Sequence, residues 1–192
     1  ITVDLFGLPA DYDAVRALAD RFGLYIIEDA AQGFGGCNAG RKACSMGDIC
    51  TTSFFPAKPL GCYGDGGACF TNNPEWASLI ESYKVHGKGT MKYDNVRIGM
   101  NSRLDTLQAS ILLVKFDAFV KYELDNINHI ASLYTQHLAG KVRTLPIVPE
   151  GYYSSWAQYT IQFDTQDMRD KVQVALKEAG IPTMVYYPKP MH

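Results

Sequence analysis

Hydrophobic residues recur every three to four positions in several segments, which is the period of a helix with one buried face. In the first segment, Val15, Leu18, Ala19 and Phe22 form one stripe between a capping aspartate, Asp11, and a glycine. The pattern therefore predicts a helix there. Helices are predicted over residues 12–22, 75–85, 166–179 and, as one long stretch with a bend near 115–118, 103–138.

Apolar runs between these helices are typical of strands. Residues 24–27 are continuously apolar, as in a parallel strand that is buried on both faces. Further strands are predicted over 48–55, 66–71, 156–163 and 182–187, with a polar loop over 88–102. The alternation of strand and helix predicts an α/β protein, in which ligands bind at the carboxyl ends of the strands.

The stripe of the long helical stretch is predicted to face the core of the protein. Its first half carries the apolar positions Leu104, Leu107, Ile111 and Val114. The β-α-β pattern after this stretch lacks the glycine-rich loops of the first part. We therefore expect a large domain over residues 1–116 and a smaller α/β domain over residues 117–192.

Composition limits the classes of function. The chain has 192 residues, with 47% hydrophobic and 20% charged positions and a net charge of −2. A net charge of −2 provides no excess of positive charge for binding nucleic acid. The apolar runs are too short for a membrane span. The five cysteines form no C-x-x-C pair, which favours reduced thiols in a cytoplasmic protein without a metal site.

The strongest candidate for chemistry is Lys58. It ends a β-prone run, lies between two prolines and precedes a glycine-rich stretch over residues 61–67. A lysine forms a Schiff base only when its amine is partly neutral, and burial or a neighbouring positive charge lowers its pKa toward that state. On its own, a lysine after a strand is usually a solvated strand end.

Lys58 lies in one of five sequence motifs, four in the body of the chain and one near its end. Together these motifs cover essentially the whole chain. They resemble the PLP-dependent nucleotide-sugar aminotransferases of the DegT–StrS group, where PLP is pyridoxal 5′-phosphate. The matching segments are Glu28-Asp29-Ala30-Ala31-Gln32, Ser53-Phe54-Phe55-Pro56-Ala57-Lys58, Gly64-Asp65-Gly66-Gly67, Gly99-Met100-Asn101-Ser102-Arg103-Leu104-Asp105 and Val185-Tyr186-Tyr187-Pro188.

The resemblance implies an aspartate-aminotransferase-type fold, with a large PLP-binding domain on a mostly parallel sheet and a small α/β domain. It implies that Lys58 is the Schiff-base lysine and the general base. Asp29 would hold the ring nitrogen protonated, Gln32 would contact the ring hydroxyl and Ser53 would bind the phosphate. The alternatives are a capping acid, a loop amide and a strand hydroxyl.

The same resemblance implies a homodimer with shared active sites. Asn101 would touch the cofactor phosphate of the partner subunit, and Arg103 would meet an anionic group of the substrate. A helix N-cap and a solvated arginine are the alternatives for these two residues. Tyr186 and Tyr187 would contact substrate, although family members commonly have His-Tyr-Pro where this chain has Tyr186-Tyr187-Pro188.

The implied activity is transfer of an amino group, most often from L-glutamate, to a keto-sugar attached to a nucleotide. Residues 53–67 look closest to the enzymes that aminate UDP-linked 3-oxo sugars, including the 3-oxo glucuronate used for bacterial surface polysaccharide. The rival readings are a 4-oxo sugar, a non-catalytic or regulatory member, and a dehydratase, which would have histidine in place of Lys58.

The chain begins at Ile1 inside a strand-like run and ends at His192 just after a strand. We therefore expect a piece of a longer protein, which lacks the start of the large domain and the end of the small one. An inactive truncated chain is a further alternative for this reason.

Overall fold

The computed structural model describes residues 1–189, and its contacts divide them into two compact units. The first unit contains residues 1–128 and 148–157, and the second contains residues 129–147 and the described residues from 158 onward. These contact-based units are not the two expected domains, whose boundary at 116 and 117 stays a prediction. The last three residues of the expected small domain lie outside the described residues.

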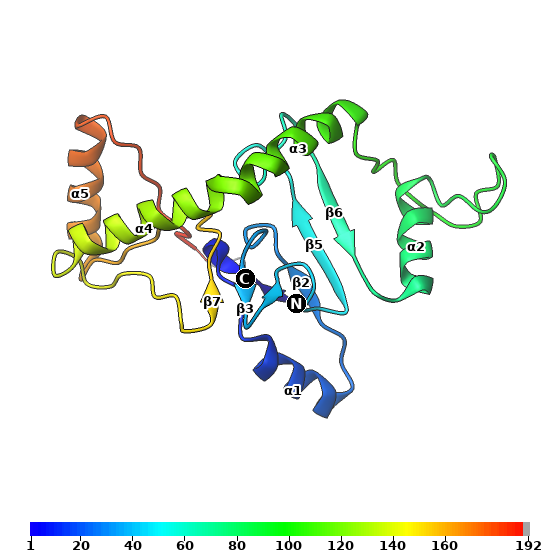
Figure 1. Ribbon diagram of the computed structural model, residues 1–192, viewed down its shortest axis with the longest axis horizontal. Helices are drawn as coiled ribbons and strands as arrows, with labels where there is room; N and C mark the ends of the chain where they lie inside the picture. Colours follow the sequence, from blue (N-terminus) through cyan, green and yellow to red (C-terminus); the bar gives the residue numbers. More distant parts are fainter. Residues whose placement is uncertain (190–192) are drawn as a thin grey trace. The chain divides into compact units, whose positions relative to one another are not determined.

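The first unit is built on a four-stranded mixed sheet, with β5 and β6 side by side (Figure 1). Strands β1, β2 and β5 run parallel, and β6 is antiparallel to β5. This confirms the predicted α/β class and the strands over 48–55 and 66–71. In spatial order the strands are β1 (Thr2–Val3), β2 (Ile27–Asp29), β5 (Ile49–Ser53) and β6 (Gly67–Phe70).

Short elements complete the first half of this unit. A 3₁₀ turn, η1 (Leu5–Gly7), follows β1. A small antiparallel sheet in the order β4-β3-β7 joins residues that are far apart in the chain. Its strands are β3 (Cys37–Asn38), β4 (Arg41–Lys42) and β7 (Tyr152–Tyr153).

Helix α1 (Tyr12–Phe22) forms where the sequence predicts it. The side chain of Asp11 accepts a hydrogen bond from Ala14 N–H, and Gly23 ends the helix with a left-handed φ of 62°. The predicted stripe is only partly right, because Ala19 is buried while Leu18 and Phe22 are exposed. The buried face is instead set by Tyr12 and Ala19, which pack with Ile26 and Met46.

The strand expected over residues 24–27 is displaced toward the carboxyl side. Strand β2 begins at Ile27, and only Ile26 of the apolar run is buried. Leu24 and Tyr25 are exposed, so the expectation that both faces of this run are buried is wrong for the described residues. Strand β2 lies later in the chain than predicted because its ladder with β5 runs from Ile27 to Asp29. The paired residues therefore include the polar Glu28 and Asp29.

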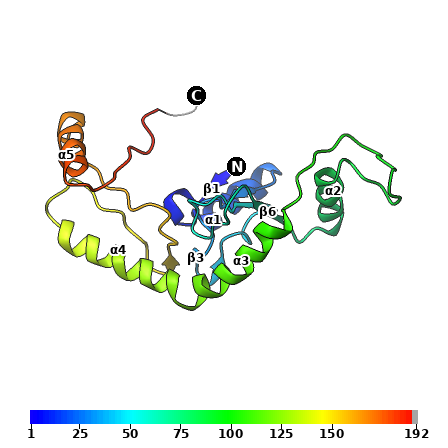
Figure 2. The ribbon, with the colours of Figure 1, turned by 90° about the horizontal axis from the view of Figure 1, so that it is seen from above.

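Helix α2 (Pro74–Lys84) is capped by Asn73, whose side chain accepts from Glu75 N–H and Trp76 N–H. The polar segment that follows it forms a loop, as predicted for 88–102. Figures 1 and 2 show this loop extending away from the sheet. None of the helices in the described part of the chain is long and apolar enough to cross a membrane.

The long helical stretch is interrupted once. It consists of α3 (Thr106–Ala118), a π-helical turn, η2 (Phe119–Glu123), and α4 (Leu124–Leu138). The predicted interruption near 115–118 therefore falls one residue further on, as a π-helical turn of the kind that commonly breaks long helices.

The predicted inner face of α3 is wrong. Leu107 and Val114 are 78% and 76% exposed, whereas Leu112 is buried. The buried position lies on a different face because the core cluster beneath the helix is built from the segment after β5. That cluster contains Phe54, Leu60, Cys62, Leu112 and Phe119.

The second unit contains most of α4 and helix α5 (Gln166–Glu178), which Thr165 caps through Met168 N–H. This helix was predicted over 166–179. The strands expected over 156–163 and 182–187 are not formed in the described residues. The first of these segments makes only an isolated bridge, Thr144 to Gln162, and a strand needs a continuous ladder.

Candidate active site

Four of the predicted site residues follow two neighbouring parallel strands. Asp29 ends β2 and Ser53 ends β5, with Asp29 opposite Thr51 in the ladder. Gln32 lies in the turn after β2, and Lys58 lies in the segment after β5. The sheet therefore gathers these residues at its carboxyl edge, where ligand sites of open α/β sheets lie.

The Asp29 carboxylate is held by the backbone that follows it. Its Oδ1 accepts from Ala31 N–H at 3.1 Å. The intervening residue is fixed to β5, since Ala30 N–H donates to Thr51 O at 2.8 Å and Thr52 Oγ1–H donates to Ala30 O at 3.0 Å. These bonds orient a half-buried carboxylate at the edge of the sheet.

Gln32 is buried and bonded to residues from distant parts of the first unit. Its Oε1 accepts from Phe6 N–H at 2.6 Å, and its backbone oxygen accepts from Ser155 Oγ–H at 2.8 Å. Ser155 could not be predicted as a partner, because nothing in the sequence around residue 155 signals a contact with a residue 123 positions away. The amide of Gln32 is thus buried and oriented, and its contact with the ring hydroxyl stays a prediction.

Ser53 and Lys58 share one segment. Ser53 Oγ accepts from Phe55 N–H at 3.2 Å, which leaves the hydroxyl hydrogen to be donated elsewhere. Lys58 N–H donates to Phe55 O at 2.9 Å, and its side chain is partly exposed. The strand end therefore presents a hydroxyl donor and an amine within one short turn.

Two fully buried acids, Asp4 and Glu28, lie close to the candidate site residues in the chain and the sheet, and nothing in the sequence indicates that they form a pair. Glu28, which is 0% exposed, accepts from the backbone N–H groups of Cys44, Met46 and Gly47 at 2.5, 2.8 and 3.0 Å. Asp4 is also 0% exposed, and its N–H donates to Asp29 O at 3.0 Å. Glu28 thus secures the loop before β5 and is not a ligand at the strand end.

Asp4 is the more unusual of the two. Its Oδ1 accepts from the Tyr12 hydroxyl at 2.8 Å, while its Oδ2 is buried without a hydrogen-bond partner among the described residues. Burial, followed by the neighbouring charge of Glu28, raises the pKa of Asp4 to about 7. Asp4 is therefore largely protonated at mildly acidic pH, which avoids the cost of burying a charged carboxylate whose Oδ2 has no partner among the described residues.

Asn101 and Arg103 lie on the segment between α2 and α3. The backbone of residues 100–102 bonds to the end of α2, with Met100 N–H donating to Tyr83 O at 2.7 Å. Both side chains are exposed, and Arg103 Nε–H donates to Asn101 Oδ1 at 3.1 Å. Both residues are predicted to act in the active site of the partner subunit, so these predictions require no contact with the site of their own chain.

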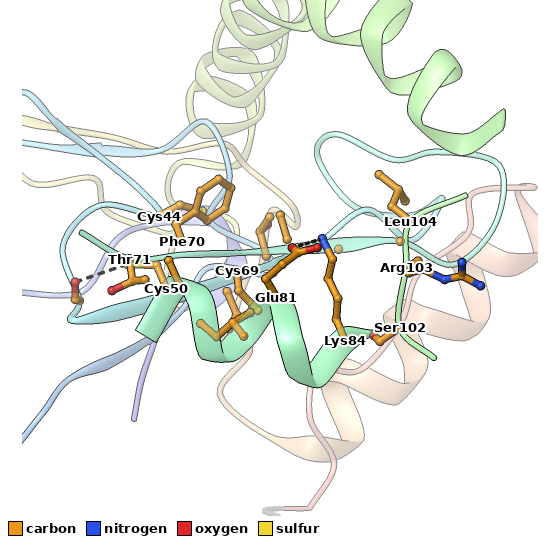
Figure 3. Close-up of a pocket in the computed structure, with 18 of the residues that line it drawn as sticks. Cys44, Cys50, Cys69, Phe70, Thr71, Glu81, Lys84, Ser102, Arg103 and Leu104 are labelled. Carbon is orange, nitrogen blue, oxygen red and sulfur yellow. Dashed lines mark hydrogen bonds and ion pairs between the residues drawn. The ribbon is translucent and has the colours of Figure 1, made fainter. Parts of the chain in front are cut away.

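An open cavity of about 1160 Å³ lies between β5, β6 and α2, and Arg103 is on the segment at its rim (Figure 3). Cys69 and Phe70 of β6 and the Glu81–Lys84 ion pair of α2 line it. The residues that line this cavity include none of the four predicted at the carboxyl edge. Its lining does include Thr52 and Gly67, which are the chain neighbour and the ladder partner of Ser53, together with the predicted site residues Asn101 and Arg103.

Tyr186 and Tyr187 belong to the second unit. They are 38% and 58% exposed, and their rings meet edge to face with centroids 5.4 Å apart. Their predicted contact with substrate stays a prediction.

The fold and the carboxyl edge define an α/β protein with a lysine-based candidate site. The model of the DegT/DnrJ/EryC1/StrS aminotransferase family matches residues 1–192, and the chain belongs to this family. The resemblance identified from the motifs is confirmed.

Individual relatives agree with the family. The chain is 45% identical over its whole length to a UDP-2-acetamido-2-deoxy-3-oxo-D-glucuronate aminotransferase from Pseudomonas aeruginosa, of which it covers 52%. It is 44% identical to a pleiotropic regulatory protein from Geobacillus stearothermophilus, of which it covers 51%. A DegT/DnrJ/EryC1/StrS aminotransferase structure from Brucella abortus matches 99% of this chain and 50% of its own, with 49% identity and a TM-score of 0.93. The chain thus spans about half the length of these proteins.

Proposed function

We propose that the protein is a PLP-dependent aminotransferase that transfers an amino group from L-glutamate to a keto-sugar nucleotide. The observation that carries the proposal is the placement of Asp29 and Lys58 after neighbouring parallel strands β2 and β5. An acid and an amine at one edge are what a cofactor with a basic ring nitrogen and an aldehyde requires.

The residues present fit this cofactor. Asp29, oriented by Ala31 N–H, offers a carboxylate to a protonated ring nitrogen. Ser53 has a hydroxyl hydrogen for a phosphate oxygen, because its oxygen already accepts from Phe55 N–H. PLP, when bound, supplies an electron sink beside the reacting carbon. The Lys58 amine would form the covalent link and, when released from it, move the substrate proton.

Gln32 fits a contact with the ring hydroxyl. Its side-chain oxygen is held by Phe6 N–H at 2.6 Å, which fixes the orientation of the amide. A fixed amide can bond to the ring without losing rotamer freedom at that moment. This role is a proposal for Gln32, as are those of the other site residues.

The proposed substrate is a UDP-linked 3-oxo sugar of the glucuronate type, which would place the enzyme in bacterial surface-polysaccharide biosynthesis. The 45% identity to an enzyme named for such a substrate supports this choice. Arg103 would pair with the uronate carboxylate. A 4-oxo sugar is the alternative substrate. A regulatory role, as in the name of the Geobacillus relative, is less well supported because both Lys58 and Asp29 are present.

We also propose a homodimer in which Asn101 and Arg103 serve the partner's site. The outer face of α3 supports this, because Leu107, Leu113 and Val114 are all exposed there. Large apolar side chains exposed on one helix are typical of a surface that a partner covers. A cytoplasmic location is part of the same proposal, supported by five cysteines that are all free thiols.

The proposal is tested by incubating the full-length protein with PLP, reducing it with borohydride and mapping the modified lysine by mass spectrometry. Label confined to Lys58, together with amino transfer from L-glutamate to the UDP-linked 3-oxo sugar, is the expected result. The matched control is Lys42→Ala, which removes an exposed lysine of β4 and should leave the labelling unchanged. Label spread over surface lysines, or none at residue 58, would contradict the assignment.

A further inference from the structure

One face of α3 is polar where it meets the segment that carries Lys58. Gln108, Leu112 and Lys115 are spaced i, i+4, i+7 and therefore lie on one side of the helix. Leu112 is buried in the core cluster with Leu60 and Cys62 of that segment. The two polar residues thus flank the point where α3 is anchored.

Both polar side chains bond to the backbone of the Lys58 segment. Gln108 Oε1 accepts from Tyr63 N–H at 2.8 Å. Lys115 Nζ donates to Gly61 O, and its ammonium lies 5.6 Å from the centroid of the Tyr63 ring. Gly61 is buried, so its carbonyl oxygen would cost a desolvation penalty if unpaired, and the bond from Lys115 favours one conformation there. Tyr63 is exposed, and the bond from its N–H to Gln108 ties the segment to α3 at the surface.

Residues 61–63 are in turn packed against the turn that contains Lys58. A Cβ added to Gly61 would lie 2.6 Å from Pro56 O and 2.8 Å from Phe55 O, so the chain folds back on itself there. Cys62 reinforces this return, because its N–H and its thiol both donate to Phe54 O, at 2.8 and 2.9 Å. The contacts therefore run without interruption from α3 through Gly61 to the turn at residues 55–58.

We propose that Gln108 and Lys115 are positioning residues that hold the segment from Phe54 to Gly66 so that Lys58 is presented at the carboxyl edge. The part that concerns the reactivity of Lys58 rests on the proposed function. The part that concerns the conformation of the segment does not. Neither residue touches the reacting atoms in this role; both act through the backbone of residues 61–63.

The test uses the full-length protein with Gln108→Leu and Lys115→Met, and the conservative variants Gln108→Glu and Lys115→Arg. Glutamate retains an acceptor for Tyr63 N–H, and arginine retains a donor for Gly61 O. Lys121→Met is the matched control, because Lys121 is an exposed lysine of the adjacent π turn and forms an ion pair with Asp117. Amide exchange over residues 55–64 is measured first, without PLP.

Exchange over this segment is expected to rise about tenfold in each of the two disruptive variants, which corresponds to ~1.4 kcal/mol. The conservative variants and Lys121→Met should keep the wild-type rate. With PLP bound, kcat should fall about tenfold in the disruptive variants, while KM for the amino donor changes less than twofold. Recovery of kcat in Lys115→Arg distinguishes positioning from a general loss of stability.

Unchanged exchange in both disruptive variants would overturn the proposal, whatever the activity. Faster exchange with an unchanged kcat would also overturn it, because the segment would then be held without consequence for Lys58. Failure of the proposed function gives a different result. In that case the wild-type protein carries no borohydride-trapped label at Lys58, and the exchange data alone decide whether α3 holds the segment.

Discussion

The hydroxyl of Tyr12 donates to Oδ1 of Asp4 at 2.8 Å inside the protein, where Asp4 is fully buried. This bond occupies one oxygen of the carboxyl group, and the charge of a second buried acid, Glu28, acts on the same group. The arrangement favours a proton on Asp4, and burial is the main reason that its pKa rises from the ordinary 3.8 to about 7.

A pH dependence of stability follows from this shift. Between the two pKa values the folded state holds a proton on Asp4 that the unfolded chain releases, so the free energy of unfolding falls as pH rises from about 4 to about 7. Asp4→Asn keeps an acceptor for Tyr12 and adds a permanent donor. Relative to wild type, the variant should gain roughly 2–4 kcal/mol between pH 5 and pH 8. Urea unfolding at several pH values measures this; parallel pH profiles for the two proteins would contradict it.

Glu28→Gln should destabilise the protein at neutral pH. The carboxylate accepts from three backbone N–H groups between Cys44 and Gly47, and a glutamine would turn its own N–H₂ toward one of these donors. The expected loss is roughly 2–4 kcal/mol in the free energy of unfolding. Glu178→Gln, at an exposed position of α5, is the control and should change the value by less than about 0.5 kcal/mol. Equal effects would show that the loop does not depend on this anion.

The sequence predicted the positions of the candidate site residues better than the hydrogen bonds that hold them in place. Asp29, Gln32, Ser53 and Lys58 could be found because each follows a strand in a recognisable motif, and parallel strands bring such positions to one edge. Their chemical roles stay predictions. The supports Asp4 and Ser155 could not be found, because Asp4 N–H bonds to Asp29 O and Ser155 Oγ–H bonds to Gln32 O, and both partners are distant in the sequence.

The helices were predicted well, and their buried faces were not. The periodicity predicted a single stripe through Leu104, Leu107, Ile111 and Val114. A different face is the inner one, because Phe54 and Leu60 pack on Leu112. Gln108 and Lys115 could have indicated the inner face of α3. Two polar residues seven positions apart, on the same side of the helix as a leucine, can mark a face whose side chains bond to the backbone of a neighbouring segment. Strands over 156–163 and 182–187 failed because alternation alone supplies no pairing partner.

Lys58→Ala should abolish amino transfer, with a loss of at least about a thousandfold in kcat, while leaving the fold intact. Lys58→Arg should fail as well, because a guanidinium stays charged and forms no imine. Single-turnover kinetics and circular dichroism are the measurements. Wild-type turnover in Lys58→Ala would remove Lys58 from the mechanism.

Mixed dimers test the shared site. Lys58→Ala and Arg103→Ala chains are each expected to be inactive, but a dimer with one of each retains one composite site with both residues. Random mixing should therefore restore about one quarter of the wild-type activity. Arg103→Lys in place of Arg103→Ala serves as a control for charge without the bidentate fork. Absence of recovery in dimers shown to be mixed would mean that each site is built by a single chain.

The bonds from Gln108 and Lys115 to Tyr63 and Gly61 bear on how this protein can be recombined with its relatives. Residues 54–66 and helix α3 are separated in the chain by β6, α2 and a long loop, yet neither has its hydrogen bonds complete without the other. A chimaera that takes the lysine segment from one relative and α3 from another would combine surfaces that were never matched. In a chimaera, residues 54–66 and helix α3 should therefore both be taken from the same parent protein.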